Sequence, residues 1–320
     1  MHGWIILDKP LGLGSTQAVS AVKRALRQSG AGKMKVGHGG TLDPLATGVL
    51  PVAIGEATKL AGRMLDSDKI YDFTIGLGVQ TDTLDLEGKV VAESAARPTL
   101  AEVEAVLGRF TGPIEQAPPA YSAILIGGQR AYDLARSGQE VEMKTRAVTI
   151  YALTIRRAEL VSASIAPSGG ESPEGERTLH QVQGDDRLGR ITLRAHVSKG
   201  TYIRSLARDV ALALGTVGHV TMLRRIKAGP FTLESAISLD KLDEVAKGGG
   251  IAQCMLPLTA GLDDIPALAV SPDDAQALRQ GKVLVGKPHT GLMLAMEGET
   301  PVALVEASGP EIRVVRGFNL

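Results

Sequence analysis

The stretch Gly37–Pro51 holds a single acid, Asp43, among glycines, prolines and other small residues. Small residues let a large planar ligand approach the backbone, and Pro44 biases Asp43 towards extended geometry. An Asp of ordinary pKa is ionised at neutral pH and can act directly as a covalent nucleophile. A turn Asp that bonds its own backbone fits the same pattern. The pattern therefore leaves two interpretations of Asp43 open, a nucleophile or a turn residue.

Three other side chains carry possible chemistry, and each also has an ordinary structural interpretation. Tyr71 alternates with Phe73 and Ile75, which predicts a core tyrosine or a ring that stacks on a base. Arg204 lies at the margin of an apolar helix face, either as a solvated charge or as the partner that keeps a carboxylate ionised. His38, five residues before the acid, is an unremarkable loop histidine or an RNA contact.

Hydrophobic periodicity, helix caps and turn-forming residues predict the helices and strands that position these residues. Helical spacing and caps predict helices near residues 15–30, 55–66, 99–107, 203–214 and 271–281. Alternation predicts strands at 71–77, 148–155, 191–197, 292–296, 302–306 and 312–315. Gly37–Pro51 is expected to be a loop, and Ser162–Arg190, rich in Ser, Gly and acids, a long disordered loop. The mixture predicts an α/β or α+β fold with a small, mainly β domain from about Ile265.

Composition excludes several classes of protein. The 320 residues suggest two domains, or one large domain with an appendage, and the one cysteine, Cys254, rules out an internal disulfide framework. P-loop, dinucleotide and G-x-S-x-G motifs do not match, and the six histidines are scattered, so we expect no metal and no cofactor. We also expect no signal peptide, no membrane span and a cytoplasmic location.

The charge is balanced over the whole chain but not along it. With 35 basic and 35 acidic residues the net charge is zero. Residues 21–63 hold seven Lys/Arg and two acids, and residues 196–230 hold six and one, so each block is +5. The two blocks predict one basic face for a polyanion or, equally well, ordinary solvated helices. The expected RNA-backbone contacts from these blocks are Lys59, Lys199, Arg224 and Arg225.

Longer blocks of the sequence resemble one family. Gly37–Lys59, GHGGTLDPLATGVLPVAIGEATK, is similar to the signature of the TruB family of tRNA pseudouridine synthases. Other blocks resemble the family in the same order: LDKP at 7–10, KIYDFTIGLGVQTDTLD at 69–85, PPAYSA at 118–123, YDLARSG at 132–138, SKGTYIRSLARD at 198–209 and HVTMLRR at 219–225. The similarity spans about residues 3–230, and the C-terminal end resembles a PUA-like RNA-binding domain.

The resemblance implies an enzyme that isomerises uridine 55 in the T loop of tRNA to pseudouridine, without a cofactor. Asp43 matches the catalytic aspartate, Tyr71 the tyrosine that stacks on the flipped-out base, and Arg204 the arginine paired with that aspartate. Three further residues match positions that contact the substrate nucleotide or shape its pocket: His38, Tyr202 and Leu223.

The implied fold is a mixed, largely antiparallel sheet with flanking helices. We expect a catalytic domain at 1–262, with an RNA-gripping insertion at 118–145 and the 162–190 loop, and a PUA-like β domain at 265–320. The expected partner is the T arm of tRNA, bound by a monomer that needs no protein partner. Two alternatives remain: an RNA-binding or tRNA-folding module without catalysis, and a guide-RNA-dependent synthase.

Two residues depart from the family pattern. Gly39 replaces the usual Thr after the histidine, and Leu125 stands where a Lys commonly follows the YSA block.

Overall fold

We describe the fold from a computed structural model, which covers residues 1–122, 124–139, 141, 143–160 and 186–320. Two compact units make up the chain: unit 1 contains residues 1–65 and 227–320, and unit 2 contains residues 66–226. Most of the loop expected at 162–190 lies outside the described residues. Its end was placed wrongly, because Leu188–Arg190 already belong to a strand. No described helix has the length and apolar character that crossing a membrane requires.

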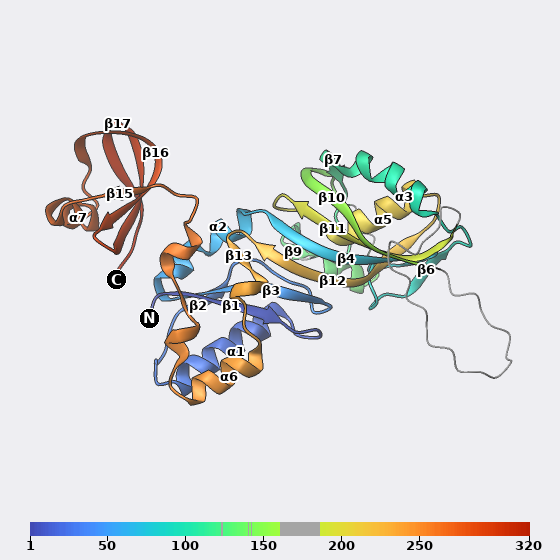
Figure 1. Ribbon diagram of the computed structural model, residues 1–320, viewed down its shortest axis with the longest axis horizontal. Coiled ribbons are helices and arrows are strands. Elements are labelled where there is room, and N and C mark those ends of the chain that lie inside the picture. The colour runs from blue at the N-terminus through green and yellow to red at the C-terminus, as the bar shows by residue number, and fades with distance from the viewer. Residues whose placement is uncertain (123, 140, 142, 161–185) are drawn as a thin grey trace. The chain divides into compact units, whose positions relative to one another are not determined.

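The sheet of unit 2 is built from long strands that pair with partners far away in the sequence (Figure 1). Its order is β12-β4-β11-β10-β7, with strands Gly218–Ala228, Lys69–Leu77, Leu188–Val197, Arg146–Leu160 and Gly112–Gln116. The pairs β4–β11, β11–β10 and β10–β7 are antiparallel, which confirms the largely antiparallel sheet.

One face of this sheet is covered by the helices α3 (Leu100–Leu107) and α5 (Ile203–Ala213), as Figure 1 shows. The strand pattern explains why, since Phe73 and Ile75 of β4 are fully buried against residues of α5 such as Leu206. A capping box begins α3, where Thr99 and Glu102 exchange hydrogen bonds, as the sequence predicts.

Shorter elements complete unit 2. They are β5 (Val79–Thr81), β6 (Val90–Glu93), η2 (Gly108–Phe110), β8 (Leu125–Ile126), β9 (Gln129–Arg130) and α4 (Ala131–Arg136). The segment 118–145, expected to grip RNA, thus contains the small hairpin β8–β9 and the helix α4.

The sheet part of unit 1 is β14-β1-β3, with β2 also paired to β3. These strands are Leu256–Pro257, Gly3–Lys9, Ala46–Ile54 and Val36–His38. Helices α1 (Ser15–Gln28) and α6 (Leu239–Lys247) lie side by side and pack on the strands through one apolar core (Figure 1). The prediction that Gly37–Pro51 is all loop was wrong, because β2 and β3 occupy both of its ends.

The remaining short elements of unit 1 connect these parts. They are η1 (Gly55–Leu60), α2 (Ala61–Asp66, whose last residue falls in unit 2), β13 (Phe231–Thr232), η4 (Leu233–Ser235), η5 (Ile251–Cys254) and η6 (Leu258–Gly261). The helix expected at 55–66 is therefore a 3₁₀ turn followed by one short α-helix.

The C-terminal part of unit 1 is a sheet of three strands, β15-β16-β17, with the helix α7. Their bounds are Ala267–Ala269, Leu284–Glu297, Thr300–Gly317 and Pro272–Arg279. Two strands expected at 302–306 and 312–315 are one continuous strand, β17. This sheet has its own core around Ala295 and Val305. The division of the chain into 1–262 and 265–320 stays a prediction.

A second core in unit 1 joins the two ends of the chain. Trp4 and Leu60 from the N-terminal segment belong to the same buried cluster as Leu304 of β17 and Phe318, which follows that strand. Trp4 is fully buried, and its Nε1 donates to the Leu258 carbonyl at 3.2 Å. Unit 1 is therefore assembled from segments that more than 150 residues separate in the chain.

Candidate functional site

Asp43 lies in the short loop between β2 and β3, and the loop backbone is held on both sides of it. The Ser15 hydroxyl accepts the Leu42 N–H at 2.8 Å and donates to the Leu42 carbonyl at 2.9 Å. On the other side, the Gly12 N–H donates to the Pro44 carbonyl at 2.9 Å. Asp43 itself is half-buried, and its carbonyl accepts the Ala46 N–H. The loop backbone is thus fixed on both sides of this acid.

Lys9 ties the same loop to the end of β1. Its side chain is fully buried, and its ammonium donates to the carbonyls of Pro10 at 2.9 Å, Leu13 at 2.6 Å and Pro44 at 3.4 Å. A buried ammonium requires such acceptors, because an unpaired charge inside a protein is very costly. The cation therefore joins the turn after β1 to the residue that follows Asp43.

His38 ends β2, opposite Val52, and is half-buried. Its Nδ1 accepts the Gly40 N–H at 3.4 Å. The departure at Gly39 has a packing reason: a Cβ there would lie 2.5 Å from the Cβ of Met64. The Thr common in the family therefore does not fit beside Met64 without a shift of one of the two. The other departure, Leu125, is 64 % exposed on β8.

Tyr71 is on β4, opposite Ala195, and its half-buried ring packs against the core of unit 2. Leu223 of β12 packs against the same core. Tyr202 is the residue immediately before α5, and Arg204 follows two positions later in the first turn. Unit 2 thus holds Tyr71, Tyr202, Arg204 and Leu223, whereas Asp43 and His38 belong to unit 1. The pairing of Asp43 with Arg204 stays a prediction.

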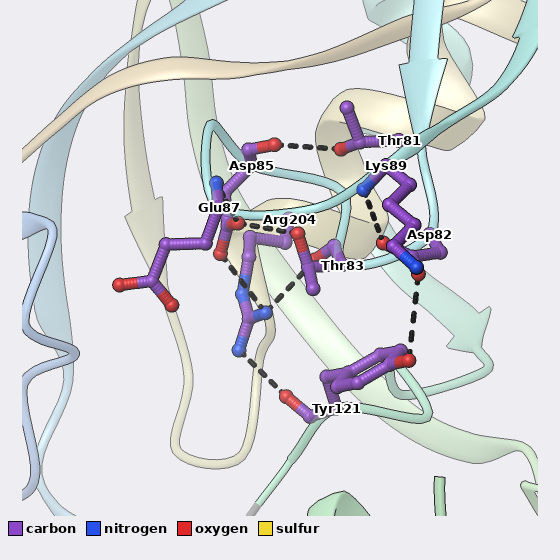
Figure 2. A network of polar contacts seen from close by, with 8 residues as sticks. All are labelled: Thr81, Asp82, Thr83, Asp85, Glu87, Lys89, Tyr121 and Arg204. Carbon is purple, nitrogen blue, oxygen red and sulfur yellow. Dashed lines mark hydrogen bonds and ion pairs between the residues drawn. The ribbon is translucent and has the colours of Figure 1, made fainter. Parts of the chain in front are cut away.

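Arg204 is the centre of a polar network in unit 2 (Figure 2). Its guanidinium donates to the Thr83 carbonyl at 2.9 Å and to the Tyr121 carbonyl at 2.9 Å. It also forms an ion pair with Asp85, with 3.2 Å between Nη1 and Oδ2. The two side chains are only 9 % and 13 % exposed. The interpretation of Arg204 as a solvated charge is therefore wrong.

The loop 81–89, which supplies Thr83 and Asp85 to Arg204, is also held by its own hydrogen bonds. Asp85 Oδ1 accepts the Thr83 hydroxyl at 2.5 Å and the Glu87 N–H at 3.1 Å, as Figure 2 shows. Asp82 accepts the Lys89 N–H at 2.9 Å. Leu84 turns the chain with a positive φ of 62° and is buried. The conformation of residues 81–89 is thus determined by its own side chains as well as by Arg204.

Sequence reasoning missed Asp85 and Tyr121 as supports of Arg204. Both lie inside blocks that carry the family resemblance, 69–85 and 118–123. The spacing Asp82-Thr83-Leu84-Asp85 is a local signal for a side-chain-stabilised turn. Nothing in the spacing indicates that α5, more than 100 residues later, would place an arginine against it.

The basic residues expected to contact RNA have different environments. Lys59 bonds Glu56 at 2.6 Å and the Gly317 carbonyl at 2.9 Å, and the exposed Lys199 pairs with Asp66 at 3.0 Å. Arg224 is half-buried, but Arg225 is only 1 % exposed, so this side chain does not lie on the surface. Burial, together with the nearby Arg225 guanidinium, lowers the pKa of Lys69 to about 8. The charge of Arg225 thus lies inside unit 2, close to Lys69.

Among the described residues, no group of three or more His, Cys, Asp or Glu side chains is arranged to hold a metal ion. Unit 1 offers one carboxylate on a fixed loop, and unit 2 offers a tyrosine ring at a sheet face and an arginine fixed by several acceptors. These groups suit chemistry on a planar base through charge, stacking and hydrogen bonding.

Known proteins with similar sequences belong to one family. The model of the "TruB family pseudouridylate synthase (N terminal domain)" matches residues 23–170, and that of the "tRNA pseudouridylate synthase B C-terminal domain" matches residues 204–263. A tRNA pseudouridine synthase B of Novosphingobium aromaticivorans is 59 % identical over all of this chain and 98 % of the relative. One of Zymomonas mobilis is 57 % identical over all of this chain and 96 % of the relative.

Solved structures with a similar fold are more distant in sequence. One chain in the structure of an H/ACA RNP bound to a substrate RNA is 23 % identical to this chain, with a TM-score of 0.69. The match covers 99 % of this chain and 85 % of the other. A Cbf5-Nop10-Gar1 complex is 24 % identical with a TM-score of 0.67, with the same coverage. The expected pseudouridine synthase fold with a C-terminal β domain is therefore confirmed. With two full-length relatives above 55 % identity, the chain belongs to the TruB family of pseudouridylate synthases.

Proposed function

We propose that this enzyme isomerises uridine 55 in the T loop of tRNA, with Asp43 as the nucleophile. One observation carries the proposal: relatives named tRNA pseudouridine synthase B match the entire chain at 57–59 % identity. Because the match leaves out no part of the chain, it includes the loop of Asp43 and the helix of Arg204.

In the proposed reaction the N1–C1′ bond of uridine breaks, the uracil turns, and a C5–C1′ bond forms. The C5 hydrogen leaves as a proton, and N1 takes up a proton in its place. No electrons are exchanged with a cofactor. Asp43 attacks the nucleotide, and the ring of Tyr71 stacks on the base that has left its helix. Turning a base out costs a few kcal/mol, which stacking and backbone contacts offset. His38, Tyr202 and Leu223 line the nucleotide in this proposal.

Arg204 has the properties that a partner of Asp43 needs. Its guanidinium is held by two carbonyls and one carboxylate, so its orientation is fixed before substrate arrives. A preorganised cation stabilises a carboxylate in its reactive ionised form without reorganisation during the reaction. Lys59, Lys199 and Arg224 supply positive charge for the tRNA backbone, and the T arm is bound by a single copy of the enzyme in the cytoplasm.

The test uses an unmodified tRNA transcript that carries tritium at C5 of its uridines. Formation of the C5–C1′ bond releases this tritium into water, and chemical probing locates the modified position. We expect release from one T-loop uridine by the unaltered protein, and none by Asp43→Asn. The exposed surface acid Asp264, which pairs with Arg63, provides the control Asp264→Asn, expected to keep full activity.

The alternatives give different results in the same assay. An RNA-binding protein without catalysis would bind the transcript and release no tritium. A guide-dependent synthase would need added RNA or protein, whereas our proposal requires activity on the bare transcript. Release that persists in Asp43→Asn would reject Asp43 as the nucleophile while leaving the reaction itself in place.

A further inference from the structure

Two residues that sequence reasoning left unassigned converge on Tyr202. Strands β7 and β10 are antiparallel neighbours in the sheet (Figure 1). In their register Gln116 lies directly opposite Arg146. Residues opposite each other in a sheet project to the same face and lie close together. Both side chains reach the segment 200–202, immediately before α5.

Gln116 holds the backbone of Tyr202 at two points. Its Oε1 accepts the Tyr202 N–H at 2.7 Å, and its Nε2 donates to the Tyr202 carbonyl at 3.1 Å. Gln116 is completely buried, and the Tyr202 side chain forms no capping hydrogen bond for the helix that it precedes. Ala117, the residue after β7, makes a further connection to α5, because the Ser205 hydroxyl donates to its carbonyl at 2.8 Å.

Arg146 holds the ring of Tyr202. Its guanidinium carbon lies 4.7 Å from the ring centroid, a cation–π distance. Its Nη2 donates to the Gly200 carbonyl, and its buried Nε has no hydrogen-bond partner among the described residues. A Cβ added at Gly200 would lie 3.6 Å from the guanidinium carbon, so the turn and the arginine are in close contact.

We propose that Gln116 and Arg146 are positioning residues, which together fix Tyr202, and through it Arg204, for reaction with the flipped-out nucleotide. This inference rests on the proposed function. Gln116 fixes the backbone of Tyr202, and Arg146 fixes its ring plane. Arg204 is two residues further on, so the same contacts set where its helix begins. Neither positioning residue needs to touch RNA for this role.

The first test separates positioning from folding. Gln116→Met removes both hydrogen bonds at similar volume, and Gln116→Glu keeps the acceptor for the Tyr202 N–H but loses the donor. Thr216→Val is the matched control, since Thr216 is buried at the other end of α5 and donates to the Ala96 carbonyl at 2.9 Å. We measure tRNA affinity, the single-turnover rate at saturating tRNA, and hydrogen exchange of the Tyr202 amide.

We expect Gln116→Met to raise exchange at Tyr202 about tenfold and to lower the single-turnover rate about tenfold, with tRNA affinity changed less than twofold. Gln116→Glu should fall between Gln116→Met and the unaltered protein, and Thr216→Val should change neither reading. Should Gln116→Met fail to fold, Gln116→Glu carries the test. Faster exchange with an unchanged rate would overturn the proposal, and so would an unchanged exchange.

The second test asks whether Arg146 acts through the ring. We expect Arg146→Met to slow turnover in the unaltered protein and in Tyr202→Phe, which keeps an aromatic face. In Tyr202→Leu it should have no additional effect. Equal effects in the two Tyr202 variants would reject a role through the ring. If the unaltered protein released no tritium, the proposed function would fail, and exchange at Tyr202 would still show whether Gln116 holds this residue.

Discussion

The ion pair of Arg204 with Asp85 allows a sharp prediction, because Asn cannot replace Asp at this position. Both oxygens of Asp85 act as acceptors: Oδ1 receives the Thr83 hydroxyl and the Glu87 N–H, and Oδ2 receives Arg204. An Asn side chain has only one oxygen. If that oxygen stays with the loop, its amide hydrogens face the guanidinium. Asp85→Asn therefore places donor against donor and removes the carboxylate of this buried ion pair.

The expected loss of unfolding free energy in Asp85→Asn follows from the burial of this ion pair. Loss of one partner of a buried ion pair costs about 3–5 kcal/mol. The carbonyls of Thr83 and Tyr121 remain, so we take the lower end, about 3 kcal/mol of unfolding free energy. At about 2–4 °C per kcal/mol, the melting temperature should fall by roughly 6–12 °C. If the same energy is lost from the position of Arg204 in the transition state, turnover falls about 100-fold.

The assay is thermal unfolding together with tritium release at saturating tRNA. Asp82→Asn is the control from the same loop. Asp82 accepts the Lys89 N–H and, at 3.4 Å, the Tyr121 hydroxyl, but it forms no ion pair with a described residue. We expect Asp82→Asn to cost about 1 kcal/mol and to leave turnover within a few-fold. Normal turnover and stability in Asp85→Asn would refute the argument that this acid fixes Arg204.

Two other predictions concern the loop of Asp43 in unit 1 and a buried lysine in unit 2. Ser15→Ala removes both hydrogen bonds to Leu42, so we expect a loss of about 1–3 kcal/mol by calorimetry and a several-fold slower turnover; unchanged values would show that Ser15 does not hold the Asp43 loop. Lys69 has a folded-state pKa of about 8, below its unfolded value of 10.5. Below pH 8 the buried side chain is charged, and this lowers the free energy of unfolding. As the pH rises from 8 towards 10.5 the side chain loses its proton in the folded state only, so the stability increases. An NMR titration of labelled lysine side chains, with Lys69→Arg to assign the signal, should show one midpoint near 8; a midpoint near 10 would contradict it.

Local patterns in the sequence predict much of unit 2 correctly. The alternation at Tyr71–Leu77 gives β4, the apolar spacing after Ile203 gives α5, and the Thr99–Glu102 box begins α3. Each of these signals is contained within a single element. Burial on one side of a strand or helix determines such patterns, so they are visible without knowledge of the neighbours.

Features that depend on tertiary neighbours were missed. Ala46–Ile54 is a strand buried at eight of nine positions, so it lacks alternation, and its Gly and Pro resemble a loop. Asp85 and Gln116 have their roles only because α5 packs beside them. Arg225 looks like a surface cation in sequence but is buried. In each case the deciding contact comes from a distant part of the chain.

The shared core of Trp4 and Phe318 has a consequence for synthesis on the ribosome. Unit 2 is one continuous stretch, so it can fold as soon as residue 226 has emerged. Unit 1 is made from both flanks, and the buried cluster that contains Trp4 is complete only when Phe318 has emerged. A chain that stops early would thus carry a completed unit 2 beside exposed apolar strands. We expect such a product to be a target for chaperones and proteases, because its apolar strands stay exposed.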